Sequence, residues 1–157
     1  MLRTRKEILI EYGSINKFLK PLHNQNINIL ESPIEAGKWS TFEILSHILF
    51  WDRFIIERLS IIKSNLQLSN ANINVDEFNK NAVNYVKSGI SYEDLLLEII
   101  VTRTKLVNLL KTFSDVDFQK QFIIQDREDT IQSYMNAMVE HDQHHFNQIF
   151  TFIKNCN

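Results

Sequence analysis

The sequence predicts an all-α protein, a four-helix bundle with long connections between its helices, and three observations support this class. Only 3 Gly and 2 Pro occur in 157 residues, too few for the frequent turns of a sandwich or barrel. Hydrophobic residues make up 44% of the chain, enough for a packed core. Four stretches repeat their apolar residues at steps of three and four, the period of an amphipathic helix. We expect one domain over residues 1–157, because this length suits a single core.

The first predicted helix runs from about residue 4 to 22, where Pro21 and a polar stretch end it. Its apolar face consists of Ile8, Tyr12, Ile15, Leu19 and Leu22. The second helix begins at a capping box formed by Ser40 and Glu43, and it continues for about 25 residues. Its apolar stripe consists of Ile44, Ile48, Trp51, Ile55, Leu59, Ile62 and Leu66.

An Asn-rich connection follows over residues 67–90, and within it residues 76–86 have the composition of a short helix. The third long helix is expected over about 91–113, with a capping serine at its first residue. A second irregular stretch separates it from the last helix, expected over about 129–154 with Asp129 as its cap. In a bundle of this kind, functional sites are built from the inward side chains of facing helices.

Charge and cysteine content exclude several classes of function. The formal net charge of −2 offers no basic field for nucleic acid or for anionic lipid, and no apolar run is long enough to span a membrane. The single cysteine, Cys156, cannot close an internal disulfide or build a cysteine-rich metal site. We therefore expect a cytoplasmic protein in which any metal is held by histidines and carboxylates.

Three histidines fall on faces that the helical pattern turns inward. His141 and His145 lie four residues apart on the last helix, a spacing that lets two imidazoles share one metal ion. His47 lies at the inward edge of the second helix. Three imidazoles from two helices would leave a coordination position open, which is typical of catalytic metal sites. The alternative, that these are hydrogen-bonded core histidines, remains open at this point.

Four other polar side chains also lie on or beside apolar faces. Arg103 on the third helix needs an acidic partner if it is buried, and Asp142 and Asp52 are the candidates. A salt bridge that only fixes the packing of the helices is as good an interpretation of these three as a catalytic role. Gln148, almost one turn past His145, is placed to line the open side of a metal site.

Two motifs make the chain resemble the DinB-like superfamily of bacterial four-helix-bundle metalloproteins, which includes the YfiT-like proteins described as metal-dependent hydrolases. The motifs are GKWSTFEILSHILFWDRF at 37–54 and EHDQHHFNQI at 140–149. The resemblance implies that His47, His141 and His145 bind a divalent metal, and that Asn79, in the segment VDEFN, borders the pocket.

The resemblance also implies a choice of chemistry, because characterised members include transferases and an isomerase that use low-molecular-weight thiols, while others are described as hydrolases. We expect Zn²⁺ first, with Ni²⁺, Fe²⁺ or Co²⁺ as alternatives, and a low-molecular-weight thiol as a potential cosubstrate. Asp142 and Gln148 are the candidate catalytic residues, and Trp51, Asn79 and Arg103 are the candidate pocket residues. The expected substrate is a small electrophile in stress or detoxification chemistry.

Two further expectations concern the class of function and the partners. The alternative to an enzyme is a non-catalytic bundle that binds a metal or a small ligand. We also expect a homodimer, because Phe42, Phe50 and Phe146 fall away from the centres of their helix stripes and would be exposed in a monomer.

Overall fold

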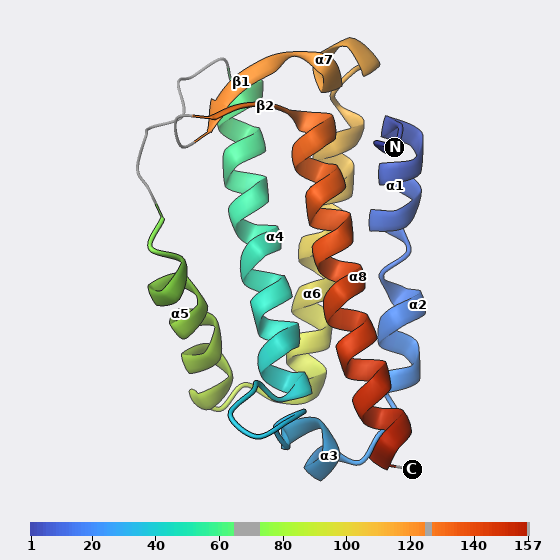
Figure 1. Ribbon diagram of the computed structural model, residues 1–157, viewed down its shortest axis with the longest axis vertical. Coiled ribbons are helices and arrows are strands. Elements are labelled where there is room, and N and C mark those ends of the chain that lie inside the picture. The colour runs from blue at the N-terminus through green and yellow to red at the C-terminus, as the bar shows by residue number, and fades with distance from the viewer. Residues whose placement is uncertain (65–72, 125–126, 157) are drawn as a thin grey trace.

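The computed structural model describes residues 1–64, 73–124 and 127–156, and long helices run side by side along its length (Figure 1). The predicted all-α bundle is confirmed. One column stacks two short helices end to end, and the others are single long helices: α1 (Arg5–Gly13) with α2 (Asn16–Leu19), α4 (Thr41–Lys63), α6 (Tyr92–Lys111) and α8 (Ile131–Cys156). A 3₁₀ turn, η1 (Lys20–Leu22), and α3 (Ile27–Glu31) lead from the first column to α4.

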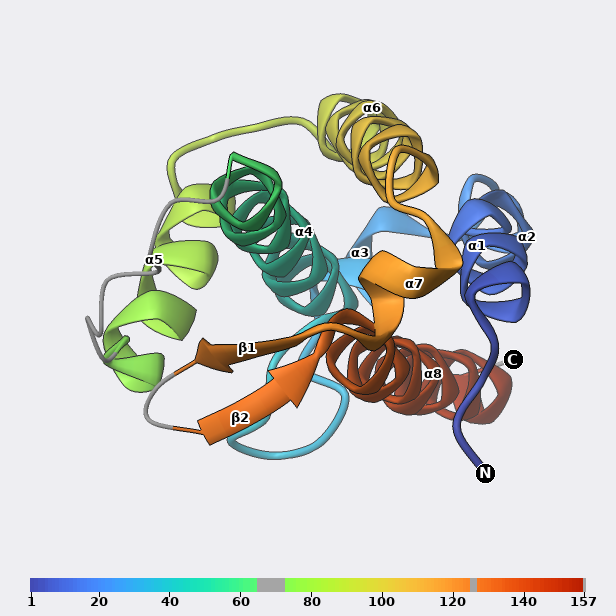
Figure 2. The same ribbon diagram turned by 90° about the horizontal axis from the view of Figure 1, so that it is seen from above.

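Viewed from above, the four columns surround one interior, and α5 (Val75–Lys87) lies outside α4 (Figure 2). Helices α4 and α8 run in opposite directions, since α4 ends near the hairpin from which α8 begins (Figure 1). Among neighbouring columns, these two make the fewest close backbone approaches, and the seam between them contains the candidate site. None of the described helices combines the length and the apolar character needed to cross a bilayer.

The helix starts follow local capping chemistry. At the start of α4 the predicted capping box is confirmed: Glu43 N–H donates to Ser40 Oγ at 3.1 Å, and Ser40 N–H donates to the Glu43 carboxylate at 2.9 Å. Ser91 caps α6 through the Asp94 N–H in the same way. The predicted cap of the last helix was wrong by one residue, because Thr130 Oγ1, not Asp129, accepts from a first-turn N–H.

Three segments differ from the sequence-based expectation. The first helix is interrupted at Ser14, whose N–H and hydroxyl both donate to the Glu11 carbonyl and so end α1. The stretch expected to be irregular contains α7 (Asp115–Gln119) and an antiparallel hairpin, β1 (Gln121–Ile124) with β2 (Arg127–Thr130), in which Gln121 pairs with Thr130. The short helix expected over 76–86 is present as α5, while residues 65–72 of the Asn-rich connection and Leu66 of the apolar stripe lie outside the described residues.

The exposed phenylalanines expected from the helical wheels are not found. Phe146 is 1% exposed and stacks on Phe18 of α2 with ring centroids 4.4 Å apart. Phe42 is also buried and packs edge-on against Tyr92 of α6, and Phe50 is half-buried against Phe78 and Tyr85 of α5. Aromatic side chains of α2, α5 and α6 cover these rings, so the wheels were wrong about them and they supply no argument for a dimer.

The core consists of two apolar clusters, one toward each end of the bundle, with charged residues at the level between them. Leu49, Ile99 and Phe146 belong to one cluster, whereas Ile55, Leu106 and Val139 belong to the other. The buried residues Asp52, Arg103 and Asp142 occupy the intervening positions on α4, α6 and α8. The bundle therefore has a polar layer near its middle, on the same helix segments as the histidines.

Candidate metal centre

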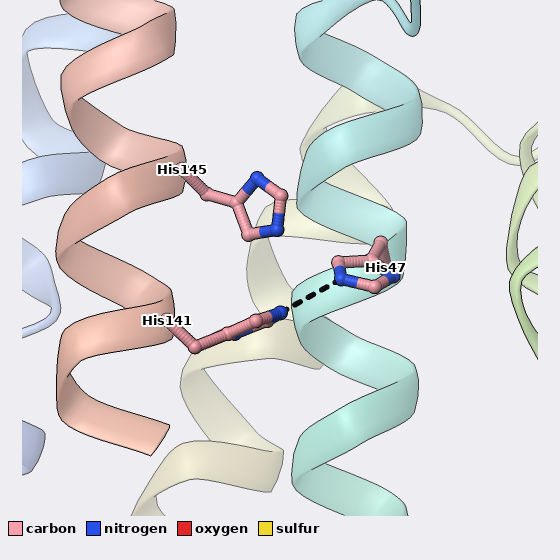
Figure 3. A group of neighbouring side chains, drawn as sticks. All are labelled: His47, His141 and His145. Atoms are coloured by element: carbon pink, nitrogen blue, oxygen red, sulfur yellow. Dashed lines mark hydrogen bonds between the residues drawn. The ribbon is translucent and has the colours of Figure 1, made fainter. Parts of the chain in front are cut away.

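Three histidines converge in the seam between α4 and α8 (Figure 3). His47 comes from the second turn of α4, while His141 and His145 come from consecutive turns of α8. His47 Nε2 lies 2.9 Å from His141 Nε2, and one ligand atom from each of the three rings lies within 4.8 Å of the others. Tetrahedral coordination at about 2.1 Å would place ligand nitrogens about 3.4 Å apart, so small rotations of these side chains suffice to hold one ion.

Side-chain oxygen atoms contact the Nδ1 atoms of two of the three imidazole rings. His145 Nδ1 lies 2.9 Å from Gln148 Oε1, and His141 Nδ1 lies 3.4 Å from Asp142 Oδ1. An oxygen at Nδ1 favours the tautomer with the proton there and leaves Nε2 free to bind metal, as is usual for histidine ligands. Asp142 and Gln148, expected as catalytic residues, thus lie where they orient the ligands.

The third ring, that of His47, lies near the Asn79 side chain of α5. His47 Nδ1 and Asn79 Oδ1 are both buried and neither forms a direct hydrogen bond with a described residue. The nearby Asn79 side chain nevertheless acts to raise the pKa of His47. The adjoining residue Ser46 anchors α5 by donating to the Ala82 carbonyl at 2.7 Å, one turn beyond Asn79.

The electrostatics of the rings suit a metal ligand. Burial and then the neighbouring imidazoles outweigh the Asn79 effect and lower the pKa of His47 to about 3. Burial, followed by the charge of His141, lowers the pKa of His145 to about 4. Both rings are therefore neutral at pH 7 and offer lone pairs. Imidazole nitrogens from three side chains fit a divalent transition metal ion such as Zn²⁺.

A buried ionic cluster supports the site from behind. Arg103 Nε donates to Asp52 Oδ2 at 2.7 Å and its Nη2 donates to Asp142 Oδ2 at 2.6 Å. The guanidinium carbon also lies 4.1 Å from the centre of the Tyr12 ring on α1. Arg103 therefore pairs with both of the acids that the sequence analysis named as candidate partners. Arg103 does not reach the histidines, and its link to them is the contact between Asp142 and His141.

The pKa values of the two carboxylates are shifted in opposite directions. Burial would raise the pKa of Asp142, but the charge of Arg103 and hydrogen bonds from His141 and Arg103 outweigh it and hold this pKa below its usual value. Burial raises the pKa of Asp52 to about 6 against the opposing charge of Arg103. Asp142 therefore stays ionised and adds a negative charge beside a potential cation, which makes it a poor general base.

Aromatic side chains form one wall next to the histidines. The Trp51 ring lies 6.1 Å from the His141 ring and 4.9 Å from Phe78 of α5, measured between centroids. Phe54, on the next turn of α4, lies 5.6 Å from Trp51. The side chain of His141 is 25% exposed, so the histidine cluster is accessible from solvent. Gln148 also lines an open groove together with His144, Lys38 and Glu35.

Two residues beside the site were missed by the sequence analysis as functional candidates. Arg58 on α4 is 8% exposed, and its guanidinium carbon lies 4.6 Å from the centre of the Phe54 ring. Tyr134 on α8 has a buried hydroxyl without a described hydrogen-bond partner. Arg58 follows His47 by about three helical turns, so the spacing could have placed it on the same face.

Comparison with known proteins identifies similar folds. A family model described as the DinB superfamily matches residues 15–149. The structure of YfiT from Bacillus subtilis, described as a probable metal-dependent hydrolase with an unusual four-helix bundle topology, matches with a TM-score of 0.75 and 15% identity, covering 97% of this chain and 87% of that one. An uncharacterised protein from Clostridium difficile matches with a TM-score of 0.80, 12% identity and 98% coverage of both chains. A protein from Streptococcus pneumoniae matches with a TM-score of 0.76 and 13% identity, covering 98% and 94%. No curated protein matches the chain.

Proposed function

The chain belongs to the DinB superfamily, and on this basis we propose that it is a metal-dependent enzyme that activates a thiol or a water molecule toward a small electrophilic substrate. The observation that carries the proposal is the convergence of His47, His141 and His145, with His47 and His141 joined through their Nε2 atoms. Three ligands leave at least one coordination position open, an arrangement typical of catalytic rather than structural sites.

A divalent ion bound here would supply Lewis-acid activation by lowering the pKa of a coordinated water or thiol toward neutrality. Asp142 and Gln148 would keep His141 and His145 in the metal-binding tautomer through their oxygens. Trp51 and Phe54 would form the apolar wall against which a small substrate packs. Cys156 is exposed near the end of α8, and we assign it no catalytic role.

The metal content of untagged protein is the first test. We expect about one divalent transition ion per chain, with Zn²⁺ the first choice and Ni²⁺, Fe²⁺ or Co²⁺ as alternatives. His145→Ala should lose the ion, whereas His144→Ala, which alters the adjacent exposed histidine, should retain it. A metal-free wild-type protein that also fails to take up added Zn²⁺ would refute the proposal.

The reaction is tested with the metal-loaded protein and a panel of electrophiles, each with and without low-molecular-weight thiols. Thiol-dependent turnover that disappears in His47→Ala supports a transferase, and turnover without thiol supports a hydrolase. Loaded wild type that is inert in every assay, but whose melting temperature still rises with a small ligand, favours the alternative of a non-catalytic binding bundle.

We also propose that the protein forms a homodimer through an exposed face of α6, and not through the phenylalanines named in the sequence analysis. Leu97 and Val101 lie one turn apart on α6 and are 59% and 44% exposed. An apolar pair of this kind favours burial against a second copy. Light scattering tests the proposal, because a mass near 18.6 kDa at working concentration would contradict it.

A further inference from the structure

Among the residues whose burial the structure describes, two arginines are buried, and their surroundings are opposite. Arg103 is 3% exposed and its charge is matched by two carboxylates. Arg58 is 8% exposed, yet no carboxylate among the described residues pairs with it. The Arg58 guanidinium instead lies over the face of the Phe54 ring. A buried charge without a counter-ion is costly, so the second arginine requires an explanation.

Two buried hydrogen-bond donors on the same helices lack partners among the described residues. The Tyr134 hydroxyl on α8 and the Trp51 indole nitrogen on α4 are buried and form no hydrogen bond with the described residues. Burial raises the pKa of Tyr134 to about 12 although the charge of Arg58 opposes this rise, so the phenol is a neutral donor at pH 7. Asp129 also acts on Tyr134, but its carboxylate accepts the Thr130 N–H at 2.8 Å and is not ion-paired with Arg58.

The antiparallel arrangement of α4 and α8 places these donors on the same side of the histidines along the bundle axis. His47 lies opposite His141 and His145, and Trp51 lies beside His141. Arg58 follows Trp51 along α4, and Tyr134 precedes His141 along α8, so both lie toward the same end of the bundle. Because the guanidinium lies over Phe54, its charge is about 10 Å along the helix axis from His47.

We propose that Arg58 and Tyr134 bind the anionic end of the substrate or cosubstrate, while its reacting end reaches the histidine cluster. The proposal rests on the proposed metal-dependent function and adds a substrate class: a small molecule that carries a carboxylate or another oxyanion about 10 Å from the atom at the metal. The rings of Trp51 and Phe54 lie between the two sites along α4, which suits an apolar chain between the two ends of the ligand. The anion provides the counter-charge for Arg58 and an acceptor for the phenol.

The experiment uses Co²⁺-loaded protein and a series of ω-mercaptocarboxylates of increasing chain length as probes. The thiolate-to-cobalt absorption band reports binding without any requirement for turnover. Each acid is compared with the ω-mercaptoalcohol of the same length, which lacks the charge. We expect the acids to bind at least tenfold more tightly than the alcohols, with a maximum at the length that spans the two sites.

Variants assign that preference to the proposed residues. Arg58→Met should abolish the preference for acids and leave alcohol binding unchanged, Arg58→Lys should retain part of it, and Tyr134→Phe, which removes one hydroxyl, should reduce it several-fold. Arg53→Met is the matched control, since Arg53 is on the same helix but pairs with Glu98 at the surface, and it should keep the wild-type preference.

The outcomes separate this inference from the proposed function. Failure of wild type to bind Co²⁺ contradicts the metal site itself. A loaded wild type that binds acids and alcohols equally at every length overturns the anion site while leaving the metal site intact. An acid preference that survives in both Arg58→Met and Tyr134→Phe also overturns the assignment to these residues.

Discussion

At the scale of single residues, the candidate site is determined by which nitrogen of each imidazole is held by an oxygen. Gln148 and Asp142 hold the Nδ1 atoms of His145 and His141, and the Asn79 side chain acts to raise the pKa of His47. These oxygens come from different helices, α8 for two of them and α5 for the third. Correct orientation of all three rings therefore depends on the docking of α5 as well as on α8.

Replacement of Asn79 tests this dependence. Binding of an ion by His47 Nε2 requires a proton at Nδ1, and we expect Asn79 Oδ1 to accept it in the metal-loaded protein. Asn79→Ala should therefore weaken Zn²⁺ binding by about 10- to 100-fold in a chelator competition assay. Asn79→Asp keeps an acceptor and should restore most of the affinity. Asn84→Ala, on an exposed position of the same helix, serves as the control, and equal affinities of Asn79→Ala and Asn84→Ala would contradict the prediction.

The lowered pKa values of His47 and His145 predict that the metal-free protein loses stability in mild acid. In the unfolded chain both rings take up a proton near pH 6.5, whereas in the folded chain they do so only at about 3 and 4. Between these values the unfolded state binds more protons, so the free energy of unfolding falls as the pH falls from about 6.5 toward 4. Asp52, whose pKa is raised to about 6, takes up a proton in the folded chain over the same range and offsets part of this effect. We expect a net loss of about 1–3 kcal/mol between pH 7 and 5.

Urea denaturation of metal-free protein at the two pH values measures this loss. His145→Asn removes one of the two groups and should reduce the pH dependence, while His144→Asn controls for the substitution on the exposed side of α8. A pH dependence that is the same in wild type and in His145→Asn would show that other groups are responsible.

At the scale of helices, sequence periodicity was sufficient to predict the long helices. It was insufficient where local hydrogen bonds or tertiary packing determine the structure. The capping box of Ser40 and Glu43 placed the start of α4 correctly because all of its partners are within four residues. The break at Ser14 depends on one side chain bonding the Glu11 carbonyl, which a wheel does not represent. The β1–β2 hairpin lay in a stretch with no sustained alternation, so periodicity gave no signal for it.

The same contrast applies to the site. The wheel identified the three histidines because their inward direction follows from helical spacing alone. It gave two candidate acids for Arg103 and could not show that both are used, since that depends on how α4, α6 and α8 pack. Arg58 was not singled out, because a charged residue on a helix is usually solvated and only tertiary packing reveals its burial.

The Arg103 cluster joins three helices, so its removal should destabilise the bundle strongly. Arg103→Met would leave Asp52 and Asp142 buried without a counter-charge, and breaking a buried ion pair in this way typically costs about 3–5 kcal/mol. Arg5→Met, which breaks an exposed pair with Asp115, should change the free energy of unfolding by less than about 1 kcal/mol. Chemical denaturation measures both, and equal small effects would show that the buried cluster is energetically neutral.

At the scale of the whole molecule, a polar layer divides the hydrophobic core and is therefore coupled to global stability. The ionic cluster separates the two apolar clusters, and His141 contacts that layer through Asp142. The histidines join α4 to α8, the neighbouring columns with the fewest close backbone approaches. An ion bound by histidines of both helices would link α4 to α8. Metal binding should therefore raise the free energy of unfolding of the entire fold.

We accordingly expect metal loading to raise the melting temperature of the whole chain. Free Zn²⁺ at about 100 times its dissociation constant stabilises the folded state by about 2.7 kcal/mol if the unfolded chain does not bind it. For a domain of this size each kcal/mol corresponds to about 2–4 °C, so the expected rise is about 5–11 °C. Differential scanning calorimetry of metal-free and loaded protein measures it. The rise should vanish in His145→Ala, which removes one ligand, and persist in His144→Ala, where the exposed neighbour is lost instead. If His145→Ala keeps the full rise, the ion binds outside the seam, because a ligand lost from the cluster must lower its affinity.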